Sequence, residues 1–166
     1  MRLKNTIRIH HISALSVVCS IAFVCIALIV RICTGSPYKI INYCGLKNVI
    51  PPVWLMALMW CFWYAVLGIT FGTVIGSKRP QNEVSKYKGG MIFIIMLSLG
   101  YVWYPLFFGS AALFLSLLVC EIVFVLSVIC AVYFSQVNRY SSFAMIIFSL
   151  WMLCMVILNI VALLNC

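Results

Sequence analysis

PPVWLMALMWCFWYAVLGITFGTVIG, residues Pro51–Gly76, is the stretch that decides the fold of this chain. It carries no charged residue, and almost every position in it is apolar. A helix rises about 1.5 Å per residue, so about 25 residues cross a hydrocarbon core of about 30 Å with some tilt. The double proline stands where a helix can begin, because the N–H groups of a first turn have no intrahelical partner. We therefore predict a membrane-spanning helix over residues 51–75.

One face of this predicted helix combines large aromatic side chains with a glycine. Trp60, Tyr64 and Gly68 recur every four residues, so they share a face that offers an indole N–H, a phenol and a notch. Trp54 lies on another face near the helix start, where interfacial tryptophans are common. Two interpretations stay open: the aromatic residues anchor and pack the helix, or they line a binding cavity.

The composition of the whole chain indicates an integral membrane protein. Of its 166 residues, 66% are hydrophobic and 8% are charged, and the mean hydropathy is +1.21. A soluble domain of this size cannot bury so much apolar surface. The net charge of +9 arises because only two residues are acidic. Since the basic residues lie in loops and tails, we expect them to meet anionic lipid headgroups, and we expect no nucleic-acid partner.

Four further apolar runs complete the predicted architecture. We predict an all-α integral membrane fold, a five-transmembrane-helix bundle that forms a single domain over residues 1–166. Gly100 and Pro105 interrupt the third helix, and the proline frees a backbone carbonyl that neighbouring helices must satisfy. The predicted helices cover about residues 12–30, 51–75, 91–109, 110–135 and 142–164.

The first loop, residues 31–50, combines many apolar residues with two glycines and a proline as breakers. We expect that it can fold over the bundle as a lid. It contains Cys33 and Cys44, which can form a disulfide if the loop is extracytoplasmic. The nine cysteines of the chain show no C-x-x-C and no Cys/His ligand spacing, so we expect no metal site and treat most of them as small apolar side chains within helices.

The distribution of basic residues predicts the orientation of the bundle. The N-terminal tail, the second loop and the fourth loop share one side of a five-span chain, and eight basic residues lie there against three on the other side. This bias favours a cytoplasmic N-terminus and an external first loop. The eight are Arg2, Lys4, Arg8, Lys78, Arg79, Lys86, Lys88 and Arg139, and the three are Arg31, Lys39 and Lys47.

Glu121 falls near the middle of the fourth predicted helix, where a charged side chain costs about 2.5–3.5 kcal/mol by insertion scales. We expect it to face the bundle interior, to be protonated, or to hydrogen-bond a polar neighbour such as Asn159, Trp60 or Trp151. A structural interhelical hydrogen bond and a functional role both remain open. No nucleophile–base pair, phosphate-binding loop or row of intramembrane charges is visible, so no catalytic residue is assigned.

Three motifs, in order along the chain, resemble those of the TspO/MBR family. This family comprises the tryptophan-rich sensory proteins and the mitochondrial translocator proteins once called peripheral benzodiazepine receptors. The second helix carries PP-x-W-x5-W-x3-Y-x3-G, the third ends in W-x-P-x-F-F-G, and the fifth holds W-x7-N. The resemblance covers about residues 43 to 165.

The chain departs from the family pattern at two points, and a third match needs a shift. Gly100 stands where the family usually has an asparagine that faces the cavity, so a polar contact is lost and room is gained. Ile147 and Phe148 replace the family's Pro-Tyr pair. Glu121 corresponds to the family's aspartate in the fourth helix only after a two-residue shift.

The resemblance implies a membrane protein that binds porphyrins or related flat tetrapyrroles in an aromatic cavity and takes part in their transport, sensing or turnover. It implies protoporphyrin IX or haem as ligand rather than as a required cofactor, and a homodimer in the lipid bilayer. The implied location is a bacterial cell membrane, or the mitochondrial outer membrane in a eukaryote. Some members have been linked to light-dependent porphyrin breakdown, which leaves enzymatic activity open. The implied ligand-binding residues are Trp60, Tyr64, Trp103, Phe107, Trp151 and Asn159, with Trp54, Gly68 and Glu121 as polar or structural residues.

Two alternatives from other functional classes remain. A small transporter or channel subunit needs a polar path, for which the helices offer little beyond Glu121 and Asn159. A structural or assembly protein would use the aromatic residues for packing, and a cavity filled by side chains would favour that interpretation.

Overall fold

The fold of the chain is an all-α bundle of five long helices. In a computed structural model, residues 14–46, 50–77 and 83–166 are described, and the N-terminal basic residues, both tail histidines, Lys47, Lys78 and Arg79 lie outside them. The helical elements are α1 (Ala14–Thr34), α2 (Tyr38–Tyr43), α3 (Val53–Ile75), α4 (Glu83–Tyr104), the π-helix η3 (Pro105–Gly109), α5 (Leu113–Ser135) and α6 (Arg139–Asn165).

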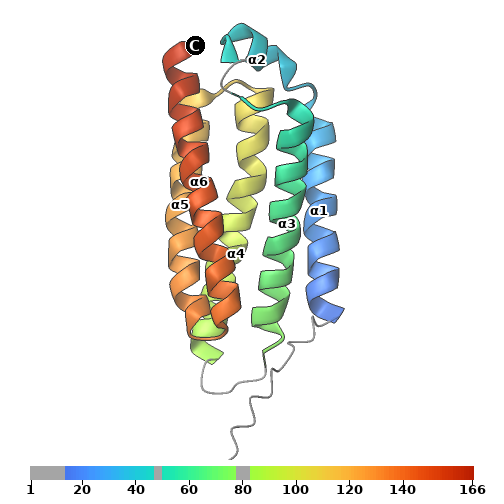
Figure 1. Ribbon diagram of the computed structural model, residues 1–166, viewed down its shortest axis with the longest axis vertical. Coiled ribbons are helices and arrows are strands. Elements are labelled where there is room, and N and C mark those ends of the chain that lie inside the picture. The colour runs from blue at the N-terminus through green and yellow to red at the C-terminus, as the bar shows by residue number, and fades with distance from the viewer. Residues whose placement is uncertain (1–13, 47–49, 78–82) are drawn as a thin grey trace, which may run out of the picture.

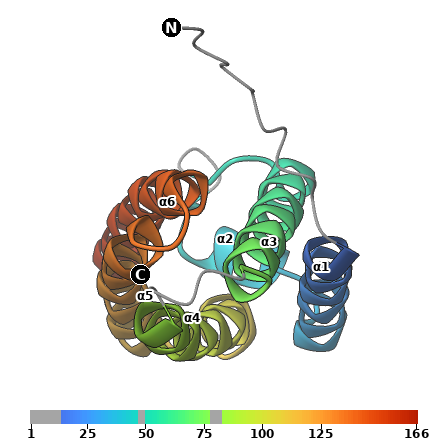
Figure 2. The same ribbon diagram turned by 90° about the horizontal axis from the view of Figure 1, so that it is seen from below.

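The long helices run alternately up and down along one axis (Figure 1). Seen along that axis, α1 lies outside α3, and α4, α5 and α6 form the other side of the bundle (Figure 2). The closest packing joins α5 to α6, α1 to α3 and α4 to α5, whereas α3 packs only loosely against α4 and α6. The bundle therefore has a loosely closed centre beside α3.

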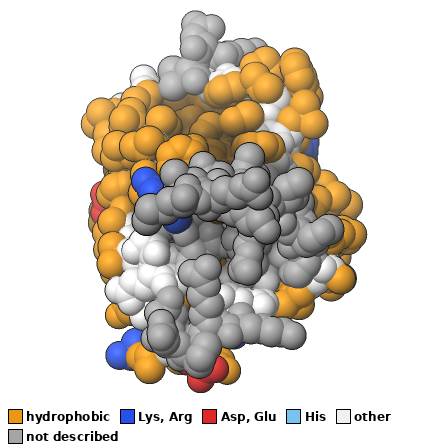
Figure 3. Space-filling model, turned by 60° about the horizontal axis from the view of Figure 1, so that its bottom comes forward, with side chains coloured by type: hydrophobic (Ala, Val, Ile, Leu, Met, Phe, Trp, Pro, Cys, Tyr) orange, Lys and Arg blue, Asp and Glu red, His pale blue; other side chains and the backbone are white. Residues whose placement is uncertain are grey.

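The outer surface of the bundle is apolar. Each of the five long helices is long and apolar enough to cross a membrane. Hydrophobic side chains cover most of the visible flanks (Figure 3). A soluble protein rarely exposes such large contiguous apolar surface, so the chain is a multi-pass membrane protein.

The third spanning helix begins earlier than its apolar run. The helix α4 starts at Glu83, although we predicted a loop to residue 90 and a helix from 91. Basic residues in its first turns are compatible with helix, and hydropathy alone cannot detect a helix that emerges from the bilayer. Gly100 does not interrupt α4. Pro105 does change it, because the five residues from Pro105 form a π-helical turn before the chain reverses.

The α1–α3 contact depends on two glycines. A Cβ atom at Gly68 would lie 2.3 Å from the Cα of Ser20, and one at Gly72 would lie 2.4 Å from the Cα of Ser16. No side chain fits there, so the two backbones touch, as in small-xxx-small helix pairs of membranes. The hydroxyls of Ser16 and Thr73, 3.3 Å apart, add a polar contact between the same helices.

A lid segment, residues 37–46, covers the end of the bundle at which α1 ends and α3 begins (Figure 1). Its short helix α2 lies across this end. The side chains of Ile40 and Ile41 in α2, and of Leu46 after it, are buried. We call this end of the bundle the lid end. The predicted folding of the first loop over the bundle is therefore what the structure has.

A disulfide ties the lid segment to the last helix. Cys44 pairs with Cys166, which directly follows α6, and their Cα atoms are 4.7 Å apart. The pairing of Cys33 with Cys44 that the sequence left open is thus wrong. Cys33 lies in the last turn of α1, where it is exposed and free.

Candidate functional site

A narrow pocket lies at the lid end between α1, α3 and α4. Its inner wall is aromatic and includes Trp60 and Tyr64 from α3 and Trp103 from α4. Pro37 and Ile41 of the lid segment roof it. The lining residues on α3 run from Val53 to Tyr64, a length of about 16 Å at the helical rise of about 1.5 Å per residue. The pocket thus extends along about three turns of α3, and we refer to it as the slot.

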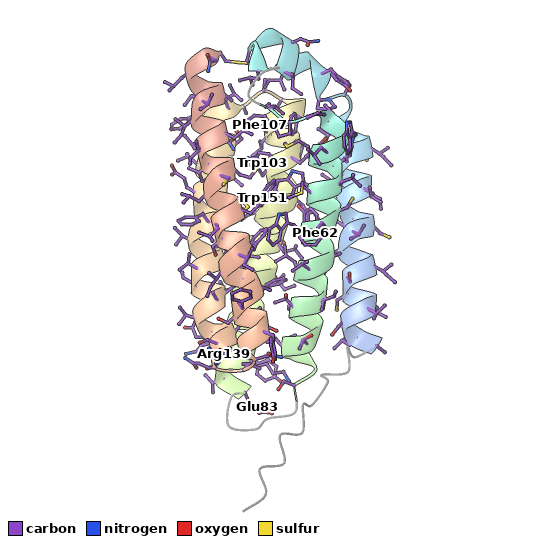
Figure 4. All side chains as sticks on the ribbon, in the orientation of Figure 1. Phe62, Glu83, Trp103, Phe107, Arg139 and Trp151 are labelled. Atoms are coloured by element: carbon purple, nitrogen blue, oxygen red, sulfur yellow. A yellow bond between two sulfur atoms is a disulfide. The ribbon has the colours of Figure 1, made fainter. Side chains whose placement is uncertain are left out.

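Four tryptophans from three helices form one cluster behind this wall. The ring centroid of Trp60 lies 5.3 Å from that of Trp103 and 6.3 Å from that of Trp151. Trp63 continues the cluster, with its ring centroid 6.1 Å from that of Trp151. Trp103 and Trp151 lie between the helices, in the half of the bundle nearer the lid (Figure 4). These rings fill the gap left where α3 packs loosely against α4 and α6.

Three indole N–H groups in this cluster have no hydrogen-bond acceptor within the described part of the chain. They belong to Trp60, Trp63 and Trp151, and each nitrogen is buried. A buried donor without an acceptor costs about 1–3 kcal/mol. Trp103 differs, because its N–H donates to Oδ1 of Asn159 at 3.3 Å. One of these unused donors, that of Trp60, belongs to a residue that lines the pocket, and the other two lie behind the lining.

The family model of the TspO/MBR family matches residues 18–164, nearly the whole of the described bundle. The chain belongs to the TspO/MBR family. It is also 26% identical over 101 residues to the "Tryptophan-rich protein TspO" of the bacterium Chlorobaculum tepidum. That match covers 61% of this chain and 63% of the length of the relative. No solved structure matches the chain.

Gly100 is one of the positions at which the chain departs from the TspO/MBR pattern, and the structure shows the space around it. Gly100 lines the pocket, and it also lines a smaller void behind Trp60 and Tyr64. A Cβ added there would have Oη of Tyr64 at 3.7 Å as its nearest neighbour, an ordinary contact. The absence of a side chain at Gly100 therefore leaves space in the pocket that the neighbouring side chains do not fill.

Asn159 lies in a buried polar network. Its Oδ1 accepts from Trp103 and, at 2.8 Å, from Oγ of Ser116, while its Nδ2 donates to the carbonyl of Met155. The side chain is completely buried and does not line the pocket. The structure places Asn159 as a polar link between α4, α5 and α6, so a direct ligand contact stays a prediction.

Phe107 and Trp151 also lie behind the lining of the pocket. The ring of Phe107 stacks on Trp103 at 5.3 Å and is fully buried in η3. Trp151 meets Trp60 edge to face. Both therefore support the pocket wall, and contact between either side chain and a ligand requires the wall to shift.

Glu121 faces outward, so the expectation of an inward carboxyl is corrected. It is exposed on α5, while the adjacent Cys120 and the nearby Val123 face the interior. The wrong prediction has a simple cause. The insertion cost indicates that a carboxyl group in the membrane has to be compensated, but it does not indicate on which face of the helix the carboxyl group lies. Trp54 is also exposed, at 64%, close to the start of α3.

Two residues important to the site were missed in the sequence. Trp63 lies three positions after Trp60, and that helical spacing is a signal that it shares a side of the helix. Arg31 lines the pocket from the last turn of α1. In the sequence, Arg31 contributes only to the charge bias that predicts orientation, because no sequence pattern shows which way a helix-terminal arginine points.

The described residues hold no group of three His, Cys, Asp or Glu side chains that could bind a metal ion. The chemistry available at the pocket is therefore that of aromatic faces, indole and phenol donors, and one guanidinium group.

Proposed function

We propose that this chain binds a flat tetrapyrrole, such as protoporphyrin IX or haem, in the aromatic pocket and takes part in the transport, sensing or turnover of that ligand. The observation that carries the proposal is the indole N–H of Trp60, which is buried at the wall of an apolar pocket without an acceptor. Membership of the TspO/MBR family supports the ligand class.

The shape and chemistry of the pocket suit a flat aromatic molecule. Aromatic rings from α3 and α4 form one side of the pocket, so a ligand with a large flat face can stack on them. Aromatic pairs contribute about 0.5–1.5 kcal/mol beyond the apolar area that they bury. Indole and phenol groups around the slot supply few but directional polar contacts, as is usual for small-molecule sites.

Entry of a large flat ligand requires a movement of the pocket lining. The slot is narrow, and its aromatic walls are almost fully buried. A large ring system therefore has to separate the walls slightly or displace the lid segment. The glycine contact between α1 and α3 lies further along α3 from the lid.

The test is quenching of intrinsic tryptophan fluorescence in the detergent-solubilised protein, titrated in parallel with protoporphyrin IX and with a sterol. We expect saturable quenching by the porphyrin. The double variant Trp60→Phe plus Trp151→Phe should weaken binding by about tenfold or more, because stacking area and an N–H donor are both lost. Trp54→Phe is the matched control, since Trp54 lies on the outer surface.

The outcomes separate the candidate functions. Unchanged porphyrin affinity in the double variant would remove the site from this pocket. Absence of saturable quenching by either ligand in the unaltered protein would leave the fold intact and shift the function to a structural, assembly or transport role.

A further inference from the structure

Arg31 occupies a distinctive position at the pocket. It lies in the last turn of α1, and it lines the pocket together with Leu28 on the same helix and Tyr104 on α4. Its side chain is partly buried. Among the described residues that line the pocket, Arg31 is the one with a charge. The lid end of an otherwise uncharged pocket lining thus carries a cation.

No carboxylate side chain of the chain itself neutralises this cation. The sequence has two acidic residues, Glu83 and Glu121, and both are described. Glu83 begins α4, 21 residues before Tyr104, which is about 31 Å along the helix. Figure 4 shows it at the end of the bundle opposite to the lid. Glu121 lies on the outer face of α5.

A helix-terminal arginine also has an ordinary structural explanation. A cation near a helix C-terminus is stabilised by the helix dipole, and a long side chain can reach the headgroup region. Neither effect needs the side chain to border a cavity. Arg31 borders one, so it has access to whatever occupies the pocket.

We propose that Arg31 is an anion anchor at the lid end of the pocket, and that the physiological ligand is a flat hydrophobic molecule that carries a carboxylate at the end nearer the lid. The inference rests on the proposed function and specifies its substrate class. The guanidinium group can bind a carboxylate with two parallel hydrogen bonds, which gives direction as well as affinity.

The guanidinium group of Arg31 and the indole N–H of Trp60 then fix the orientation of the ligand. The unpaired N–H of Trp60 lies on α3, seven residues beyond the lid-proximal Val53, about 10 Å along the helix. Arg31 lies one turn from the end of α1. A ligand with its carboxylate at Arg31 therefore extends its ring system past Trp60 toward Gly100, where the missing side chain leaves space.

The test compares protoporphyrin IX, which carries two carboxylates, with its dimethyl ester, which has the same ring system and no charge. Both are titrated in an uncharged detergent, so that no lipid phosphate competes for the cation. The variants are Arg31→Gln and Arg31→Lys, and the control is Arg139→Gln, which removes an exposed cation at the opposite end of the bundle (Figure 4).

We expect the unaltered protein to bind the acid more tightly than the ester. Arg31→Gln should weaken acid binding by roughly five- to thirtyfold and leave ester binding within about twofold. Arg31→Lys should retain part of the preference, because it keeps the charge and loses the paired hydrogen bonds. Unchanged ester binding also shows that the variant pocket is folded.

Three results would overturn the anchor, and they differ from failure of the proposed function. Equal binding of acid and ester by the unaltered protein excludes a carboxylate contact. A preference for the acid that survives in Arg31→Gln assigns it to another cation. An Arg31→Gln effect that is equal for both porphyrins and occurs only in bilayers with anionic lipid assigns Arg31 to a lipid phosphate. Binding of neither porphyrin would instead remove the proposed function together with its anchor.

Discussion

The two halves of α3 pack in opposite ways. In the half distant from the lid, Gly68 and Gly72 bring the backbone of α3 into direct contact with α1. In the half nearer the lid, Trp60 and Tyr64 hold α3 away from α4 and leave a slot. One helix therefore has a contact without side chains at one end and a wall of large rings at the other.

This difference separates stability from binding along a single helix. In a bilayer the hydrophobic effect does not drive helices together, so close backbone packing of the kind seen at the glycines supplies much of the association energy. The half that forms the slot keeps unpaired indole donors and empty space, which are unfavourable for stability and useful for a ligand. The glycine contact thus keeps α3 in place while the aromatic half remains adaptable.

The largest expected effect comes from adding one methyl group to the glycine contact. Gly68→Ala places a Cβ 2.3 Å from the Cα of Ser20, so α1 has to move away. Overpacking of this kind costs about 1–3 kcal/mol, and the melting temperature in detergent should fall by roughly 5–10 °C. Thermal unfolding followed by helical circular dichroism measures it.

The matched control adds the same methyl group to the other half of the comparison. Gly100→Ala meets only the ordinary contact with Tyr64, so its melting temperature should stay within about 2 °C of the unaltered protein. Equal destabilisation by the two substitutions would show that the two halves do not differ in packing as described.

A smaller effect is expected from release of the lid segment. Cys166→Ser removes the disulfide that joins Cys44 to the end of α6. The bond closes a separation of 122 residues, for which the chain-entropy model gives up to about 5 kcal/mol in a soluble chain. The gain should be smaller here, because inserted helices are already confined. We expect a fall of a few degrees in melting temperature and several-fold faster porphyrin dissociation, measured by stopped-flow fluorescence.

Reductant provides the internal check on this prediction. It should reproduce the effect of Cys166→Ser in the unaltered protein and have no effect on the variant itself. Cys33→Ser is the control, because Cys33 is exposed and unpaired. Porphyrin dissociation that is insensitive to both the variant and reductant would mean that the lid does not control the pocket.

The sequence predicted the architecture and three of the residues that line the pocket, Trp60, Tyr64 and Trp103, for identifiable reasons. Long apolar runs are sufficient to locate spanning helices, and the spacing of Trp60 and Tyr64 is sufficient to place both on one face of α3. The lid was predictable because the first loop contains more apolar residues than a solvent-exposed loop usually does. These features depend on local pattern, which a single sequence contains.

Other features depend on how the helices rotate and meet, and the sequence does not contain that information in readable form. The outward position of Glu121 follows from the rotation of α5 about its axis. The Cys44–Cys166 disulfide joins segments 122 positions apart, so spacing within the first loop suggested the wrong partner. The position of Arg31 at the pocket likewise becomes visible only when α1, α4 and the lid segment are placed together.

The central claim is that the slot beside Trp60 and Gly100 is the ligand site, and Gly100→Leu tests it most directly. The added side chain projects into the pocket, where the backbone leaves it free space. The measurement is a protoporphyrin IX titration followed by tryptophan fluorescence, with the melting temperature recorded on the same sample. We predict at least a tenfold loss of affinity with a melting temperature that is unchanged within about 2 °C. Unchanged affinity in a folded Gly100→Leu protein would contradict the account, because a filled slot would then still bind.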